Sequence, residues 1–301
     1  MKLKIIEHKG IFISISVVLV TLAVASLVFF GLKPGIDFKS GSMWQVKAPG
    51  ATEASIRDFA VSDLKIEDPI VSYDKNSDSY SLVFREISPS ERTSFNESLI
   101  KKFPGGEEMD FSMTSPSVSA ELKNKAIWVV ILVLLVIAAY IAFAFRSVSH
   151  PIQSYKYGLV AILALAHDVT IAAGVYALFG HFAGITIDTN FVVALLTIAA
   201  FSVQDTIVIM DRVRENLLSS KHKETLSEVV GKSLNEVFFR SFITSVSIML
   251  VLAAITFFGP LSVRYFSLTM LVGMFFGTYS SLFVASPLLV LWHELDNKFK
   301  K

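Results

Sequence analysis

Six long runs of apolar residues dominate the pattern of this chain. A helix needs about 20 predominantly apolar residues to cross a bilayer, and residues 11–32, 126–145, 157–178, 189–210, 237–258 and 265–291 meet this requirement. The first run carries an Ala-x-Ala pattern at 23–25 that is typical of a signal-peptide cleavage site. However, the run is longer than the apolar core of a signal peptide, so we interpret it as an uncleaved span. The pattern therefore predicts a polytopic α-helical membrane protein with six transmembrane helices.

The polar stretch between the first two runs predicts a folded domain. Segments 42–48, 69–73, 79–84 and 109–113 have the alternation that is typical of strands. Thr52 fits a helix cap, and Ser-Pro-Ser-Glu from Ser88 is a capping box with proline at the first helical position. The order strand–helix–strand–strand–helix–strand is that of a ferredoxin-like α+β domain. We thus expect three parts: residues 1–32, a ferredoxin-like domain at 33–124, and five further spans at 125–301.

The distribution of Lys and Arg predicts the orientation, because short cytoplasmic segments are enriched in both. One side of the predicted membrane holds Lys2, Lys4, Lys9, Arg146, Lys156, Arg212, Arg214, Lys221, Lys223, Lys232, Lys298, Lys300 and Lys301. On the other side, the short segments 179–188 and 259–264 hold only Arg264. We therefore expect both termini and a loop at 211–236 in the cytoplasm, and the domain at 33–124 on the exported side.

Composition narrows the function classes. The 301 residues are 53% hydrophobic with a mean hydropathy of +0.59, and the net charge of +1 gives no support to a nucleic-acid partner. Because cysteine is missing, disulfides, thiol catalysis and zinc–thiolate sites are excluded. The sequence also lacks the motifs of P-loop nucleotide binding, zinc metalloproteases and serine hydrolases. We expect neither enzymatic activity nor a cofactor.

Two acidic residues interrupt the apolar runs. Asp205 lies six residues before Asp211, which is roughly 9 Å along a helix axis. Asp168 lies near the middle of the third run. An ionisable residue inside the hydrocarbon is costly and is therefore a functional-site candidate; an aspartate bonded to neighbouring helices is the structural alternative. An intramembrane aspartyl protease would need two aspartates at one depth in the membrane. The predicted depths of Asp168 and Asp205 differ by several ångströms, so we keep the protease only as a minority hypothesis.

Arg240 and His167 are candidate neighbours of these acids. In the predicted topology Asp205 and Arg240 lie in the same cytoplasmic half of the membrane. An aspartate and an arginine at matching depth are natural partners, because each otherwise carries an unpaired charge in lipid. The alternative for Arg240 is a snorkelling anchor at the helix end. His167, next to Asp168, fits a satisfied buried imidazole better than a proton relay.

Small residues mark the sixth run. Gly273 and Gly277 are four positions apart and are followed by hydroxyl residues at 278–281. Glycines at this spacing let helices approach closely, and hydroxyls can bond across the interface. We interpret this face as a packing surface; the lining of a water path is the alternative. The mixed charges at 211–232 fit a helix that lies along the membrane surface or against a partner.

Four short stretches carry a family resemblance. They are Gly35, Ile36, Asp37 and Phe38; the Ala-His-Asp-Val at 166–169; residues 202–216, which include Ser202, Gln204, Asp205, Asp211 and Arg212; and residues 277–289. On these stretches the chain closely resembles the SecF branch of the SecD/SecF protein-export family, in the resistance–nodulation–division superfamily. Three positions depart from the family pattern: Ala200-Phe201 stands for Gly-Tyr, Gln204 for Asn, and Ser40-Gly41-Ser42 for Gly-Gly-Thr.

The resemblance implies proton-coupled assistance to secretion through the Sec machinery in the bacterial plasma (inner) membrane. In this family the residues matching Asp205 and Arg240 belong to the proton path, and ATP is used by the separate SecA motor. The expected partners are SecD, the SecY/SecE/SecG channel, the unfolded polypeptide in transit and membrane lipids. H⁺ is the expected coupling ion, with Na⁺ as the alternative, because one carboxylate suits either.

We expect Asp205 to alternate between a protonated state and an ionised state paired with Arg240. Asp168 would belong to the same pathway, with Ser202, Gln204 and His167 in support. Two other functions compete with this hypothesis: a small-molecule or lipid exporter of the same superfamily, and a purely structural subunit of the Sec channel. Exporters of that superfamily usually carry twelve spans and two exported domains, so a chain of this size fits a half-unit that pairs with a second subunit.

Overall fold

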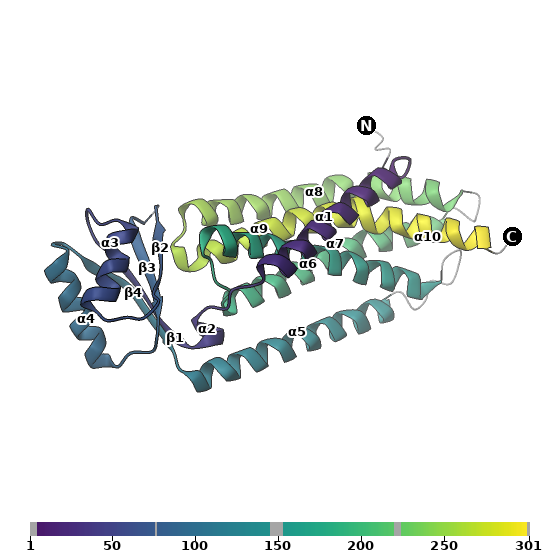
Figure 1. Ribbon diagram of the computed structural model, residues 1–301. Coiled ribbons are helices and arrows are strands. Elements are labelled where there is room, and N and C mark those ends of the chain that lie inside the picture. The colour runs from purple at the N-terminus through teal and green to yellow at the C-terminus, as the bar shows by residue number, and fades with distance from the viewer. Residues whose placement is uncertain (1–4, 76, 145–152, 220–223, 300–301) are drawn as a thin grey trace.

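The structure is a computed structural model that describes residues 5–75, 77–144, 153–219 and 224–299. Within these residues, six helical segments are long and apolar enough to cross a membrane, which confirms the six predicted spans. Figure 1 shows a helix bundle with a small α+β unit at one end, while the beginning of α1 and the end of α10 lie at the other. Seven basic residues used in the topology prediction lie outside the described residues: Lys2, Lys4, Arg146, Lys221, Lys223, Lys300 and Lys301.

The bundle is built from long helices. They are α1 (Lys9–Phe30), α5 (Pro116–Ala144), α6 (Ser154–Ala183), α7 (Thr189–Ser219), α8 (Leu226–Phe258), α9 (Leu261–Ser280) and α10 (Ser286–Phe299). α6 is among the most buried spans and α5 is the least buried. α6 packs against α1, α7 and α9, whereas α5 stands apart from much of the bundle in Figure 1. The apolar surface of α5 is therefore left largely to lipid or to another protein.

The helix ends differ from the predicted span ends. α5 begins at Pro116 rather than at 126, and α7 and α8 extend into the predicted loop at 211–236. Hydropathy detects only the part of a helix that lies in the hydrocarbon, whereas the helix itself can continue through polar residues on either side. The last span is also not one regular helix, because the π-helical turn η2 (Ser281–Ala285) separates α9 from α10. Such turns are frequent at functional sites.

The α+β unit has the predicted order of elements. These are β1 (Gly41–Lys47), α3 (Glu53–Asp58), the π-helical turn η1 (Phe59–Asp63), β2 (Ile70–Asp74), β3 (Ser79–Phe84), α4 (Pro89–Lys102) and β4 (Glu107–Thr114). The four strands form an antiparallel sheet in the order β2-β3-β1-β4. The capping box predicted at Ser88 is present, and the cap predicted at Thr52 is a full capping box with Ser55; each begins its helix at the expected position. The unit is thus a folded domain with local sequence signals that agree with its structure.

The core of the α+β unit lies between the sheet and its helices. Trp44 of β1 is 1% exposed, and it donates a hydrogen bond from Nε1 to Glu108 at 2.8 Å. Arg92 of α4 forms an ion pair with the same carboxylate and lies over the ring of Phe111, with 4.4 Å from Cζ to the ring centre. The hydrogen bond from Arg92, followed by the one from Trp44, lowers the pKa of Glu108 against the opposing effect of burial. α4 is thereby attached to the edge strand β4.

One ion pair attaches the α+β unit to the bundle. Arg264, in the first turn of α9, pairs with Asp74 at the end of β2. The two side chains are only 13% and 9% exposed. Because the chain connects the unit to the bundle only at its two ends, this pair is a third point of attachment.

Candidate functional site

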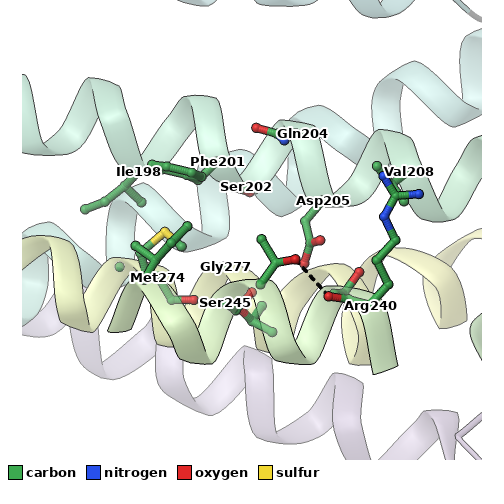
Figure 2. Close-up of a pocket in the computed structure, with 15 residues that line it drawn as sticks. Ile198, Phe201, Ser202, Gln204, Asp205, Val208, Arg240, Ser245, Met274 and Gly277 are labelled. Atoms are coloured by element: carbon green, nitrogen blue, oxygen red, sulfur yellow. Dashed lines mark hydrogen bonds between the residues drawn. The ribbon is translucent and has the colours of Figure 1, made fainter. Parts of the chain in front are cut away.

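A cavity of about 120 Å³, lined by both polar and apolar side chains, lies between α7, α8 and α9. Several residues singled out in the sequence line it: Ser202, Gln204, Asp205, Arg240, Gly273 and Gly277. Thr278, from the hydroxyl run at 278–281, also lines it, together with three hydroxyl residues that the sequence did not single out: Ser241, Thr244 and Ser245. Apolar side chains such as Ile198 and Phe201 form the rest. Figure 2 shows Asp205 and Arg240 on the same side of this cavity.

Asp205 has an open hydrogen-bonding position in this cavity. Its Oδ2 is buried without a hydrogen bond of normal geometry among the described residues, and so is Oγ of Ser241 on the facing helix α8, which is the hydroxyl that approaches this carboxyl group. A buried polar atom left without a partner costs about 1–3 kcal/mol. A polar cavity holds water once it exceeds about 10–15 Å³, and this one is several times larger. The arrangement can therefore hydrate the carboxyl group and exchange a proton with it.

Arg240 lines the same cavity, but it is not bonded to Asp205. Its side chain is exposed, and in Figure 2 the guanidinium lies beside Val208. Within the described chain, no ion pair or hydrogen bond joins the two side chains. Arg240 carries a long flexible stem, which can move the guanidinium while the helix stays fixed. The pairing of Asp205 with Arg240 stays a prediction.

Asp168 lies in the most extensively bonded polar group of the bundle. It is 0% exposed and accepts hydrogen bonds from Nδ1 of His167 at 2.8 Å, from Oγ of Ser202 at 2.5 Å and from Oγ of Ser280 at 2.7 Å. These donors come from α6, α7 and α9, so one carboxylate connects three helices. Hydrogen bonds to a carboxylate are roughly twice as strong as neutral ones. Ser280 is one of the hydroxyl residues at 278–281 that the sequence analysis expected to bond across a helix interface; its partner Asp168 was not predicted.

His167 is bonded through only one of its ring nitrogens. Nδ1 donates to Asp168, whereas Nε2 is buried with no hydrogen-bond partner in the described structure. The ring lies 6.5 Å from the ring of Tyr279, centre to centre. The sequence predicted a buried imidazole with both nitrogens hydrogen-bonded; this holds for Nδ1 and not for Nε2.

The two glycines of α9 have different surroundings. A Cβ atom at Gly273 would lie 2.2 Å from Cδ1 of Ile198, so only glycine permits the observed contact between α9 and α7. A Cβ atom at Gly277 would lie 3.6 Å from Oδ2 of Asp168, which is an ordinary contact. The packing interpretation thus fits Gly273, and the cavity-lining alternative fits Gly277.

The signature Gly35–Phe38 holds the segment after α1 against the start of α7. The N–H of Gly35 donates to the carbonyl of Ile187 at 2.8 Å, and a Cβ atom at Gly35 would lie 2.8 Å from Oγ1 of Thr186. Oδ2 of Asp37 accepts from the backbone N–H and the hydroxyl of Thr189, at 2.9 and 2.7 Å. Thr189 is the first residue of α7, and Asp188 before it accepts from the N–H of Phe191 at 2.8 Å, so Asp37 is a second capping acceptor at the start of the helix that carries Asp205.

The remaining signature residues lie away from the cavity. Ile36 and Phe38 belong to the short helix α2 (Ile36–Lys39), are partly buried, and place α2 against α5. Asp211 pairs with Arg214 at 3.5 Å. Arg212 bonds Glu215 at 2.5 Å and Glu236 of α8 at 2.6 Å. Asp211 and Arg212 thus support the extension of α7 beyond its apolar part.

Comparison with known proteins decides the family. Residues 95–295 match the model of the protein export membrane protein SecD/SecF, C-terminal. The chain belongs to the SecD/SecF family. The protein translocase subunit SecF of Thermobaculum terrenum is 36% identical over 307 residues, which cover 97% of this chain and 94% of that protein. SecF of Sebaldella termitidis is 31% identical over 305 residues, which cover 100% and 94%. These relatives are transport components, and the predicted resemblance is confirmed.

Solved structures of SecDF share the fold. The crystal structure of SecDF, a translocon-associated membrane protein from Thermus thermophilus, matches with a TM-score of 0.84 at 27% identity and covers 98% of this chain. SecDF in its Super-membrane-facing form matches with a TM-score of 0.69 at 26% identity. The chain spans only 39% and 40% of the lengths of these two SecDF chains.

Proposed function

We propose that this chain is the SecF subunit of a Sec protein-export machinery. With a SecD partner, it uses the proton motive force to assist late steps of polypeptide translocation. Relatives named as SecF translocase subunits over nearly the full length support this assignment. The match to about two fifths of a SecDF chain supports the pairing, because the rest of SecDF has no counterpart in this chain. The SecY/SecE/SecG channel, the moving polypeptide and membrane lipids are the other partners, without nucleic acid or a bound cofactor.

The proposed placement is the bacterial plasma (inner) membrane, with both termini cytoplasmic and a ferredoxin-like domain exported. Two ion pairs near one end of the bundle support the proposal that the charged ends of α1, α6 and α10 lie on the same side of the membrane. Lys9 of α1 pairs with Glu294, and Lys156 of α6 pairs with Asp296, so α10 joins both helices there. The α+β unit lies at the opposite end in Figure 1, and its strand order fits the ferredoxin-like topology.

The single observation that carries the mechanism is the open Oδ2 of Asp205 in a polar cavity between three helices. A proton bound there removes the charge of the carboxylate. After the proton leaves, Arg240 of α8, which lines the same cavity, is the cation that can approach it. The two states favour different contacts between α7 and α8, and the proton supplies about 2.3 kcal/mol per 100 mV of membrane potential. Asp37 connects α7 to the segment that leads into the α+β unit, which gives the change a route to that unit.

The test is Asp205→Asn in the complex with SecD, in membrane vesicles that import a secretory protein with and without a proton gradient. We expect import that no longer depends on the gradient, while the protein stays folded, because asparagine keeps the size of the side chain but cannot ionise. Asp211→Asn is the matched control, since Asp211 pairs with Arg214 outside the cavity. Normal gradient dependence in Asp205→Asn would refute the mechanism. Replacing Na⁺ by K⁺ in the same assay distinguishes H⁺ from Na⁺ as the coupling ion.

A further inference from the structure

The pair formed by His167 and Asp168 is a buried polar group that the sequence placed in the proton pathway, and the exchange of a proton at Asp205 gives it no role of its own. His167 is 7% exposed and Asp168 is 0% exposed. Nε2 of His167 points into the protein with no hydrogen-bond partner in the described residues. A buried polar atom left open costs free energy, so a purely structural clamp does not explain it. An open acceptor beside a carboxylate is, however, what a proton-binding group requires.

This pair adjoins the Asp205 cavity. Ser202 lines the cavity and also donates from Oγ to Asp168 at 2.5 Å. It precedes Asp205 by three residues, which is about 4.5 Å along α7. Gly277 lines the cavity on the side of α9, and the position of its missing Cβ is 3.6 Å from Oδ2 of Asp168 and 3.7 Å from Cβ of Ser202. The absence of a side chain at Gly277 thus leaves a gap between the cavity and Asp168.

We propose that His167 and Asp168 form a second proton-binding site, which is reached from the Asp205 cavity through the gap at Gly277. Ser202 relays the proton: its hydroxyl gives a proton to Oδ2 of Asp168 and takes one from a water molecule in the cavity. That water is in turn reprotonated by Asp205. At the end Asp205 is ionised, Asp168 is neutral, and Ser202 and the water are unchanged. The inference rests on the proposed proton coupling and adds a second site to it.

The side chains from α7 and α9 that bond Asp168 carry no charge, so a bound proton is what would neutralise its carboxylate. α7 contributes Ser202, α9 contributes Ser280, and neither carries a charge. The titratable groups that face Asp168 among the described residues are His167 and, beyond it, Tyr279 of α9. α1 is bonded to Tyr279, whose hydroxyl donates to the carbonyl of Phe12 at 3.0 Å and accepts from Ser16 at 3.4 Å. A buried carboxylate without a fixed cation is costly, and one bound proton removes its charge.

Gly277→Ala tests the gap, because the added methyl makes only ordinary contacts and alanine is the better helix former. The measurement is infrared difference spectroscopy of the complex with SecD in lipid, after a step in pH. Asp168→Asn and Asp205→Asn each remove one protonated-carboxyl band and so assign both bands. We expect Gly277→Ala to keep the Asp205 band and to slow the Asp168 band. Ser202→Ala, which removes the relaying hydroxyl, is expected to slow the Asp168 band by about a hundredfold, the low end for losing a positioned proton-transfer group. Gly277→Ser adds the same Cβ with a hydroxyl, and we expect it to restore the rate.

The outcomes separate this inference from the proposed function. If Asp168→Asn removes no band, or if Gly277→Ala and Ser202→Ala both leave the Asp168 band at the rate of the unchanged protein, the second site is refuted. Ser202→Ala also tests the relay if Gly277→Ala does not fold, because it removes a hydroxyl without adding volume. The import assay with Asp205→Asn is scored independently, so a failure of proton coupling is seen there and not in the infrared bands.

Discussion

Asp37 provides the sharpest test of how the bundle is connected to the α+β unit. Its carboxylate accepts two hydrogen bonds from Thr189 at the start of α7, and both are exposed to solvent. Replacing a capping Asp by Ala costs about 0.5–2 kcal/mol. We expect Asp37→Ala to cost about 1.4 kcal/mol, which makes opening of the first turn of α7 about tenfold more frequent. Asp37→Asn keeps an acceptor oxygen and loses only the charge–dipole interaction of about 0.3–1 kcal/mol, so its effect is smaller.

The assay is hydrogen–deuterium exchange of the complex with SecD in lipid nanodiscs, followed in peptides that cover the start of α7. Exchange there is expected to be about tenfold faster in Asp37→Ala and about twofold to fivefold faster in Asp37→Asn, with α8 unchanged in both. Asp58→Ala is the control, because Asp58 is an exposed residue of α3. Unchanged exchange in Asp37→Ala would refute the capping role, and equal effects of the two variants would show that the acceptor oxygen is irrelevant.

The remaining two predictions concern the α+β unit. Arg264→Ala removes the cation from its largely buried ion pair with Asp74, which keeps the hydrogen bond from Ser77. Breaking a buried pair costs on the order of 3–5 kcal/mol. Spin labels on cysteines introduced into this cysteine-free chain should report longer distances between unit and bundle, and unchanged distances would contradict the attachment. Glu108 has a lowered pKa in the folded unit, so its stabilising contribution is present above the unfolded pKa of about 4.3 and is lost as the pH falls through the folded pKa. Urea unfolding of Glu108→Gln should therefore be less sensitive to acid than that of the unchanged protein, and equal sensitivity would argue against this linkage.

The number of spans and the order of elements in the α+β unit were predictable because their signals are local. The bilayer imposes length and composition on each span separately. Strand alternation and the capping box at Ser88 likewise depend on residues a few positions apart. The acidic residues of the apolar runs were also predictable as candidates, since the cost of a charge in lipid does not depend on which helix lies next to it.

The connections within the site were not predictable, because they join residues far apart in the chain. Ser280 and Asp168 are 112 positions apart, and Thr189 and Asp37 are 152 positions apart. Nothing in the local sequence distinguishes a serine that donates to a buried carboxylate from one that packs. The π-helical turn η2 was missed for a related reason, since one inserted residue leaves the apolar composition of its span unchanged.

The contact between α1 and α6 has a consequence for biosynthesis. The hydroxyl of Ser26 donates to the carbonyl of Gly174 at 2.8 Å, across 148 positions of sequence. A ribosome adds about 5–20 residues per second, so the two partners are made about 7–30 s apart. During that interval α1 is already in the bilayer with its serine unpaired by α6, while the α+β unit is synthesised between them. The contact between α1 and α6 therefore forms late, when α6 arrives, and until α5 is made the apolar length of the first helix alone retains the nascent chain in the membrane.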